Sequence, residues 1–161
     1  MKSIMILRHA EAALNSKIDH NRSLTIKGEK DSNKIGQYIE SINHIPQLVI
    51  TSSANRALST AKNVISAGKW GSNLNIESSI YGGKPDYLLS LLSKQKNEYD
   101  IICLIGHEPN FSTFIAKITD NIYRPLRTAS IVLINLDIVK WENIQFGMGT
   151  LSWHIEPKLL K

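Results

Sequence analysis

Two histidines in this sequence directly follow apolar segments. One apolar run leads into Arg8 and His9, and a second leads into Gly106 and His107. An apolar run of this length predicts a buried strand, and open α/β sheets place their chemistry beyond the C-terminal ends of such strands. A histidine there can be a nucleophile or a base, and the planar fork of an arginine suits phosphate or carboxylate. Either dipeptide alone could simply cap a strand, so the interpretation depends on the recurrence of the pattern.

Two further arginines belong to the same pattern. Arg56 follows a serine-rich turn and falls in the first turn of a predicted helix, and Arg22 lies near the end of a polar loop over residues 11–23. Several arginines around one crevice match phosphoryl oxygens bidentately and stabilise the charge that spreads over them during transfer. Nearby cations favour the neutral form of a histidine, which keeps the lone pair that a nucleophile needs. The residues therefore predict covalent catalysis, in which a histidine attacks phosphorus and water later hydrolyses the phosphohistidine.

The elements that must position these residues alternate between strand and helix. Helices are predicted from Thr25, a plausible N-cap, and after residues 54, 87 and 109. We expect strands at residues 4–8, 47–51, 74–76, 99–105 and 128–136, with further, antiparallel edge strands at 138–146 and 151–155. This alternation predicts an α/β fold with a mostly parallel central sheet and antiparallel edge strands.

The composition narrows the class of protein. A chain of 161 residues predicts one domain over residues 1–161. The net charge of +5 could suggest nucleic-acid binding, but the basic residues are scattered and no aromatic residues alternate with them. We see no signal peptide and no apolar run long enough to cross a membrane, so we expect a cytoplasmic protein. The single cysteine, Cys103, excludes an internal disulfide and reads as a buried thiol.

Competing chemistries lack their signatures. Cys103 has Pro109 six positions further on, where a cysteine phosphatase needs an arginine. The chain has no G-x-x-x-x-G-K-[ST] loop, and no second histidine follows His107 at helical spacing as a zinc protease requires. The acidic residues do not cluster as a magnesium or two-metal site needs. We predict no metal and no other cofactor.

Three segments together resemble the histidine phosphatase superfamily, also called phosphoglycerate mutase-like. They are Leu7-Arg8-His9-Ala10-Glu11, Ser52-Ser53-Ala54-Asn55-Arg56-Ala57-Leu58-Ser59-Thr60 and Ile105-Gly106-His107-Glu108-Pro109. The shortness of the chain and the segment Arg22-Ser23-Leu24-Thr25 resemble the small bacterial phosphohistidine phosphatase (SixA-like) branch. The resemblance implies a three-layer α/β/α fold and a role in signal transduction. It also implies that His9 is phosphorylated and that Arg8, Arg56 and His107 bind the phosphoryl group, with Arg22 joining them in the small branch.

Two positions depart from the superfamily pattern. Ala10 stands where the superfamily usually has glycine, and its methyl group would be costly if that residue needed a positive φ. The superfamily also supplies an acidic general acid from the region after the third strand, and the matching place around Ser79 carries no carboxylate. Asp86 and Glu77 are the nearest candidates, and we favour Asp86. A phosphohistidine substrate could carry the needed proton on its own imidazole, so a weak general acid would harm phosphoramidate cleavage least.

Three functions remain open from the sequence. The favoured one is a metal-independent phosphatase that removes phosphate from phosphohistidine on a protein, because a short chain leaves no long insertion to enclose a sugar phosphate. The alternatives are a phosphatase of a small phosphorylated metabolite and a phosphate-binding module without turnover. We expect no nucleic-acid or membrane partner, and a monomer or weak dimer.

Overall fold

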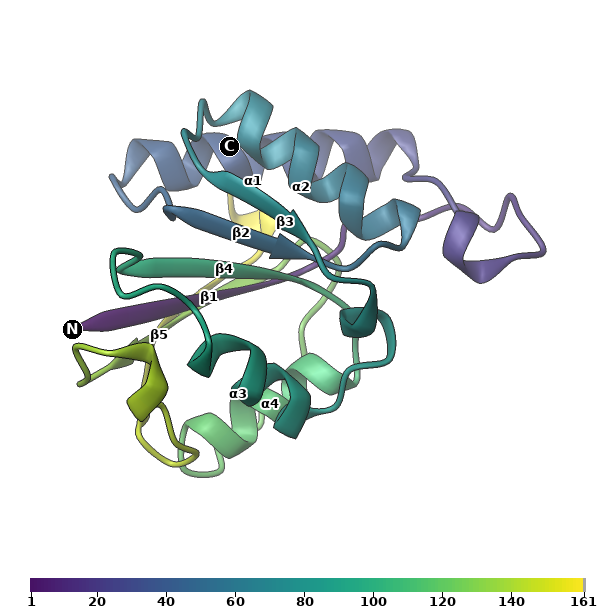
Figure 1. Ribbon diagram of the computed structural model, residues 1–161. Coiled ribbons are helices and arrows are strands. Elements are labelled where there is room, and N and C mark those ends of the chain that lie inside the picture. The colour runs from purple at the N-terminus through teal and green to yellow at the C-terminus, as the bar shows by residue number, and fades with distance from the viewer. Residues whose placement is uncertain (161) are drawn as a thin grey trace.

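A computed structural model describes residues 1–160 of the chain and places a six-stranded sheet between two pairs of helices (Figure 1). Helices α1 and α2 cover one face of the sheet, and α3 and α4 cover the other. The strands are β1 (Lys2–Arg8), β2 (Leu48–Thr51), β3 (Asn73–Ile76), β4 (Ile101–Gly106), β5 (Ile131–Leu136) and β6 (Gly149–Ile155). The helices are α1 (Ile26–Ser41), α2 (Asn55–Ala67), α3 (Pro85–Ser93) and α4 (Asn110–Ile118). This architecture confirms the predicted three-layer α/β/α class.

The sheet order puts the ends of three parallel strands side by side. The order is β3-β2-β4-β1-β5-β6, with β3, β2, β4 and β1 parallel and with antiparallel pairing from β1 to β5 and from β5 to β6. Arg8 pairs with Gly106 across β1 and β4, and Thr51 pairs with Ile105 across β2 and β4. The residues that follow these strands therefore emerge at one edge of the sheet, where open α/β folds bind their ligands.

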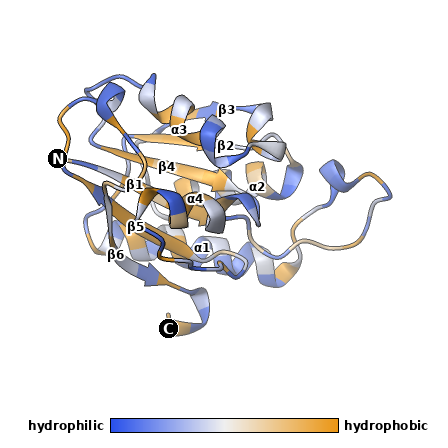
Figure 2. Cartoon of the chain, turned by 90° about the horizontal axis from the view of Figure 1, so that it is seen from below, coloured by the Kyte–Doolittle hydropathy of each residue, from blue (hydrophilic) through white to orange (hydrophobic). Residues whose placement is uncertain are grey.

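Side-chain alternation along β1 divides the core between the two faces of the sheet. Ile4 and Ile6 pack in the cluster with the buried residues of α3 and α4, whereas Met5 and Leu7 pack in the cluster with those of α1 and α2. All four are completely buried, and burying a side chain of this size stabilises the fold by about 1.5–3 kcal/mol. Figure 2 shows the strands as largely hydrophobic, with hydrophilic residues spread over loops and outer helix faces. The strand carrying Arg8 is therefore a rigid support.

Local signals fix where α1 begins and how closely it packs. The Thr25 side chain accepts a hydrogen bond from the Gly28 backbone N–H, which confirms the predicted N-cap. Further along α1, a Cβ on Gly36 would lie 2.5 Å from the carbonyl oxygen of Val64 in α2. Glycine at this position lets the two helices come into backbone contact.

The predicted edge strand at residues 138–146 is wrong. Its central residues 141–143 form a short 3-10 helix, and the sheet ends instead with β6, which begins at Gly149. The cause is Trp141, which is completely buried and donates from its backbone N–H to Asn97 Oδ1 and from its indole N–H to the Tyr99 carbonyl. The buried residues of this segment, Ile138, Trp141 and Ile144, recur every third position, a spacing that suits a 3-10 turn rather than a pleated strand.

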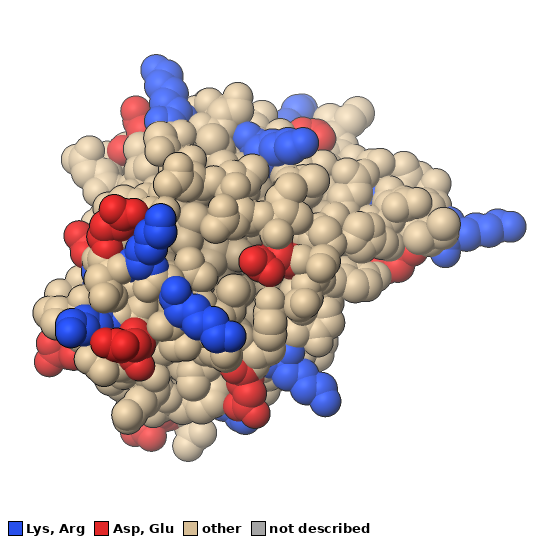
Figure 3. Space-filling view, viewed as in Figure 1, with Lys and Arg blue, Asp and Glu red and all other residues tan. Residues whose placement is uncertain are grey.

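Charges of both signs are interspersed over the face shown in Figure 3. The positive net charge of +5 therefore does not gather into a single-sign patch on that face. None of the helices within residues 1–160 is long and apolar enough to span a bilayer. Cys103 is completely buried in β4, as predicted.

Candidate active site

The sheet edge brings the two predicted histidines into contact. The rings of His9 and His107 have their centroids 5.3 Å apart, and only 7% and 6% of these residues are exposed. Arg56, in the first turn of α2, donates from Nε to His9 Nε2 at 3.3 Å. Arg8, at the end of β1, also lies close enough to lower the pKa of both histidines by its charge. We refer to Arg8, His9, Arg56 and His107 as the His–Arg cluster.

Hydrogen bonds fix which ring nitrogen of His9 carries the proton and which carries the lone pair. Its Nδ1 lies 2.7 Å from the Ala10 carbonyl oxygen, which can only accept, so Nδ1 carries the proton and Nε2 carries the lone pair. Burial, together with the charges of Arg56 and Arg8, lowers the pKa of His9 to about 4, although the bond to Ala10 opposes the shift. Near neutral pH this imidazole is uncharged with its lone pair at Nε2, which is the state a nucleophile requires.

His107 is held by a residue that follows β2. Its Nε2 lies 2.8 Å from Ser52 Oγ, while its Nδ1 is buried and has no hydrogen-bond partner among the described residues. Burial and the neighbouring His9 and Arg56 lower the pKa of His107 to about 3, so this ring is also neutral near pH 7. With the Ser52 hydroxyl donating to Nε2, the Nδ1–H would be a donor ready for an oxygen acceptor.

The loop after β1 supplies a carboxylate that the sequence analysis did not single out. Asp19 Oδ2 accepts from Arg56 Nη2 at 3.0 Å, and the Asp19 carbonyl accepts from Arg56 Nη1 at 2.9 Å. Arg22 Nη1 donates to Asp19 Oδ1 at 3.1 Å, and the hydroxyl of Tyr81 donates to Oδ2. Hydrogen bonds from Tyr81, Arg22 and Arg56 hold the pKa of Asp19 far below its usual range, so this carboxylate is ionised.

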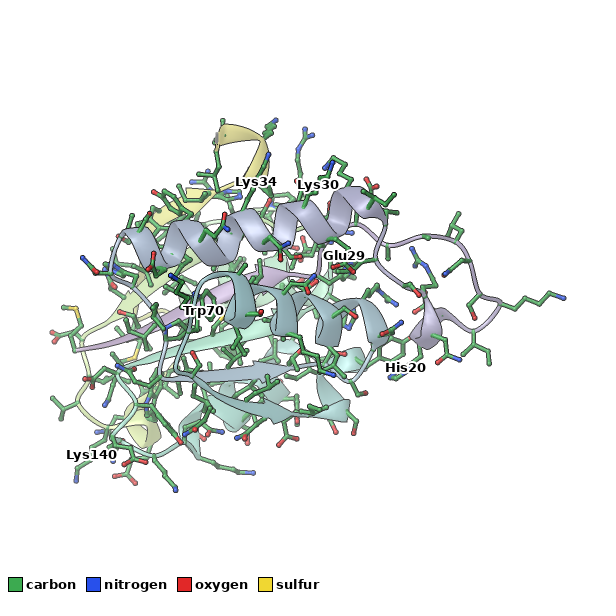
Figure 4. All side chains as sticks on the ribbon, turned by 90° about the horizontal axis from the view of Figure 1, so that it is seen from above. His20, Glu29, Lys30, Lys34, Trp70 and Lys140 are labelled. Atoms are coloured by element: carbon green, nitrogen blue, oxygen red, sulfur yellow. The ribbon has the colours of Figure 1, made fainter. Side chains whose placement is uncertain are left out.

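Arg22 meets the His–Arg cluster through Asp19. Its other donors reach the carbonyls of Ala13, at 3.0 Å, and Ala12, at 3.4 Å, so the guanidinium also fastens the loop that carries it. In Figure 1 this loop projects beyond the sheet edge where the parallel strands end. In Figure 4, His20 lies beside the start of α2, in agreement with its 3.0 Å contact to Ser53 Oγ.

Arg8 is anchored on the other side of the cluster. Its Nη1 donates to the Leu126 carbonyl at 2.9 Å, whereas its Nε is buried without a partner among residues 1–160. Glu108 accepts from the backbone N–H groups of Ser112, at 2.6 Å, and Leu126, at 3.0 Å. Glu108 thus accepts from a backbone N–H group in the first turn of α4.

The two departures from the superfamily pattern have different outcomes. Ala10 is not among the residues with positive φ, and its backbone N–H donates to Thr60 Oγ1 at 2.9 Å, so the extra methyl group is accommodated in the core. Asp86 is exposed in the first turn of α3, Glu77 is half-buried, and no hydrogen bond or ion pair described for residues 1–160 joins either to the His–Arg cluster. The segment after β3 instead brings Tyr81 edge-on to His107, with ring centroids 5.3 Å apart.

Sequence reasoning thus found the four cluster residues and Arg22 but missed Asp19, Tyr81 and Ser52. Asp19 precedes Arg22 by three residues, a spacing that could have suggested an ion pair. Tyr81 gave no comparable signal, because only the folded chain places it over the cluster. Within residues 1–160, no group of three or more His, Cys, Asp or Glu residues is arranged to hold a metal ion.

Comparison with known proteins identifies relatives of this arrangement. The model of the histidine phosphatase superfamily (branch 1) matches residues 4–79. An uncharacterised chloroplastic protein of Arabidopsis thaliana is 25% identical, over 96% of this chain and 76% of that protein. The matched region of the family model includes His9, Arg22 and Arg56, but ends before His107.

Solved structures share the fold over nearly the whole chain. The protein histidine phosphatase SixA in complex with tungstate superposes with a TM-score of 0.86 and 23% identity, covering 98% of each chain. A mycobacterial glucosyl-3-phosphoglycerate phosphatase in complex with VO3 superposes with a TM-score of 0.72 and 13% identity, covering 95% of this chain and 99% of that one. At these identities the likeness shows the fold, which is the phosphoglycerate mutase-like fold expected from the motifs.

Proposed function

We propose that this chain is a histidine phosphatase and that it hydrolyses phosphohistidine on a protein through a covalent phosphohistidine formed on His9. The superfamily match supports the predicted enzyme class, a phosphatase hydrolase. The observation that carries the proposal is the contact of Arg56 Nε with His9 Nε2, because it sets a cation beside the lone pair of a neutral imidazole.

The proposed reaction needs two displacements at phosphorus. In the first, the His9 Nε2 lone pair forms a bond to phosphorus, and the bond to the leaving group breaks with its electron pair moving to that group. In the second, a water oxygen forms a bond to phosphorus and the P–Nε2 bond breaks. Its electron pair returns to His9 Nε2, and the phosphoryl group leaves as orthophosphate, which keeps the protons of the water. Arg56 and Arg8 would bind the phosphoryl oxygens, whose charge rises in both transition states.

Two buried nitrogens support this placement of the phosphoryl group. Arg8 Nε and His107 Nδ1 have no hydrogen-bond partner among the described residues, and such groups are rare in folded proteins. Oxygens of a phosphoryl group bound at His9 would satisfy both. Tungstate and vanadate, the oxyanions present in the two solved relatives, have the same kind of oxygen acceptors.

Trapping the intermediate tests the proposed mechanism. We expect brief incubation with a radiolabelled phosphohistidine peptide to leave acid-labile, base-stable label on the wild-type protein and none on His9→Ala. His44→Ala is the matched control, since His44 bonds to its local Ile42 carbonyl and packs on Trp153, and this variant should be labelled as the wild type is. Label that persists in His9→Ala would refute His9 as the nucleophile. Tight phosphate binding with no label and no turnover would favour a binding module.

A protein substrate has support from the surface beside the site. A cavity of about 490 Å³ is lined by Arg8 and by charged residues of both signs, among them Glu11, Lys27 and Glu156. Of the His–Arg cluster only Arg8 lines this cavity, so it lies beside the site rather than over His9, where its mixed charge suits a polypeptide segment flanking a phosphorylated histidine. The SixA likeness favours the same substrate class.

A phosphatase of a small phosphorylated metabolite is the second candidate. It is favoured by the glucosyl-3-phosphoglycerate phosphatase, which shares the fold across the whole chain. Comparing kcat/KM for a phosphohistidine peptide with that for a panel of sugar phosphates and phosphoglycerates separates the two. Our proposal predicts that kcat/KM for the peptide is at least about tenfold higher than kcat/KM for every ester. If the kcat/KM of any ester equals or exceeds that of the peptide, the small-metabolite phosphatase becomes the better assignment.

A further inference from the structure

The mouth of the candidate site carries a negative charge that the bound phosphoryl group does not need. The Asp19 side chain is 50% exposed and Tyr81 is 38% exposed, whereas the Arg56 side chain beneath them is 8% exposed. Asp19 and Tyr81 are therefore the outermost members of the network above His9. A leaving group departs on the side of the phosphorus away from the attacking nucleophile and must reach solvent, and Asp19 and Tyr81 lie on the solvent side of this network.

The carboxylate at this position cannot act as a proton donor. Hydrogen bonds from Tyr81, Arg22 and Arg56 keep the pKa of Asp19 far below its usual range, so no proton is available on it near neutral pH. Asp19 therefore supplies no proton to a leaving group, and a substrate that carries its own proton has an advantage beside it. A phosphohistidine does so as an imidazolium, because the ring nitrogen that is not bonded to phosphorus carries an N–H.

The carboxylate also has room for one more donor. An ionised carboxylate offers about four acceptor positions. Arg22 uses one position on Oδ1, and Arg56 and Tyr81 use positions on Oδ2. A further position on Oδ1 remains among the contacts of the described residues. The rings of Tyr81 and His20, with centroids 5.3 Å apart, give an aromatic surface next to it.

We propose that Asp19 is a specificity residue that accepts a hydrogen bond from the N–H of the imidazolium leaving group of phosphohistidine. This inference rests on the proposed function. The contact favours the protonated substrate: as the His9 Nε2–P bond forms, the substrate P–N bond breaks. Its electron pair returns to the ring nitrogen, and neutral imidazole departs with its N–H still in place. Esters, whose leaving oxygen carries no cation, gain nothing from Asp19.

The test is a ratio of specificities. For wild type and Asp19→Asn we compare kcat/KM for a phosphohistidine peptide with kcat/KM for para-nitrophenyl phosphate, whose phenolate leaves unprotonated. Loss of a hydrogen bond to a charged group should lower the ratio by about tenfold or more. Asp19→Glu, which keeps the charge, should restore the ratio to within about threefold of wild type. Because Asp19 also orients Arg56, absolute rates on both substrates will fall, which is why the ratio is the readout.

A matched control removes a carboxylate elsewhere. Glu142 is exposed in the 3-10 helix next to Lys140, which lies at the opposite end of the molecule from His20 in Figure 4. Glu142→Gln should leave the ratio unchanged. An equal loss on both substrates in Asp19→Asn would overturn the inference and make Asp19 a purely structural partner of Arg56. A higher kcat/KM for both substrates in Asp19→Asn would also overturn it, and would show that the Asp19 carboxylate competes with the phosphoryl group for Arg56.

The outcomes separate this inference from the proposed function. If wild type labels His9 from para-nitrophenyl phosphate but does not hydrolyse the peptide, then the proposed substrate is wrong and the role of Asp19 falls with it. If wild type hydrolyses the peptide and the ratio does not change in Asp19→Asn, only the role of Asp19 is wrong.

Discussion

Protonation of the two buried histidines should make the folded protein sensitive to mild acid. Burial is the main cause that lowers the pKa of His9 to about 4 and that of His107 to about 3, against 6.5 for an ordinary histidine. Between these values and 6.5 the unfolded chain binds protons that the folded chain does not. The folding stability therefore rises with pH across this window: it is complete above pH 6.5 and is lost as the pH falls towards 4.

The magnitude follows from the width of the window that is crossed. From pH 6.5 down to pH 5, each histidine lowers the free energy of unfolding by about 1.4 kcal/mol per pH unit, or by about 2 kcal/mol in all. His9 and His107 together should therefore cost about 4 kcal/mol between pH 7 and pH 5, a large share of the total stability of a typical domain. His9→Asn keeps a donor for the Ala10 carbonyl but cannot be protonated. We expect it to lose about 2 kcal/mol less than wild type over the same range.

Urea unfolding at pH 7 and pH 5 measures this difference directly. The buffers must lack phosphate and sulfate, because an anion that binds only the folded state would add stability of its own. The other titrating groups are shared by wild type and His9→Asn. His9 contributes to the low pKa of His107, but at about 3 this pKa lies well below pH 5, so His107 adds little difference over the range compared. An equal loss of stability in the two proteins would refute the conclusion that His9 is held neutral by its burial.

Four further predictions concern the scaffold, and each is checked by urea unfolding at pH 7. Gly106→Ala should cost about 1–3 kcal/mol, because the new Cβ would lie 2.8 Å from Ile80 Cγ2. Gly71→Ala, where nothing lies within 4 Å of the new Cβ, should stay within about 0.5 kcal/mol of wild type. Trp141→Ala should cost about 3–5 kcal/mol by emptying a completely buried position. Thr25→Ala should cost about 1 kcal/mol by removing the N-cap of α1. Equal costs at both glycines, or no cost at Trp141 or Thr25, would contradict these assignments.

The sequence was informative wherever function follows a regular element. His9 and His107 could be placed because each directly follows an apolar run, and parallel strands align their ends at one edge of a sheet. Arg56 could be placed because it falls in the first turn of the helix after the neighbouring strand. In all three cases the residue's position depends on a backbone pattern that a few consecutive residues reveal.

The sequence was uninformative where the path of a loop or the packing of one large side chain determines the local structure. Asp19 lies in a polar segment whose path is set by contacts that only the folded chain makes, such as those of Arg22 with two loop carbonyls. The wrong strand at residues 138–146 has a similar origin. The segment is rich in apolar residues, but its buried positions are three residues apart, and the indole N–H of Trp141 donates to the Tyr99 carbonyl from a non-strand backbone. Periodicity records which residues are apolar and not which single contact outweighs the rest.

The hydrogen-bond inventory of Arg56 explains why this position needs an arginine. Its Nε, Nη1 and Nη2 donate to His9, to the Asp19 carbonyl and to the Asp19 carboxylate, which uses three of five N–H groups. Two N–H groups remain for phosphoryl oxygens while the nucleophile and the loop stay in place. A lysine has only three donors on one nitrogen, so it could not orient His9, hold Asp19 and bind a phosphoryl group together. When the His9 Nε2 lone pair bonds to phosphorus, the hydrogen bond from Arg56 Nε must break, so this guanidinium positions the nucleophile before attack and keeps its hold on Asp19 afterwards.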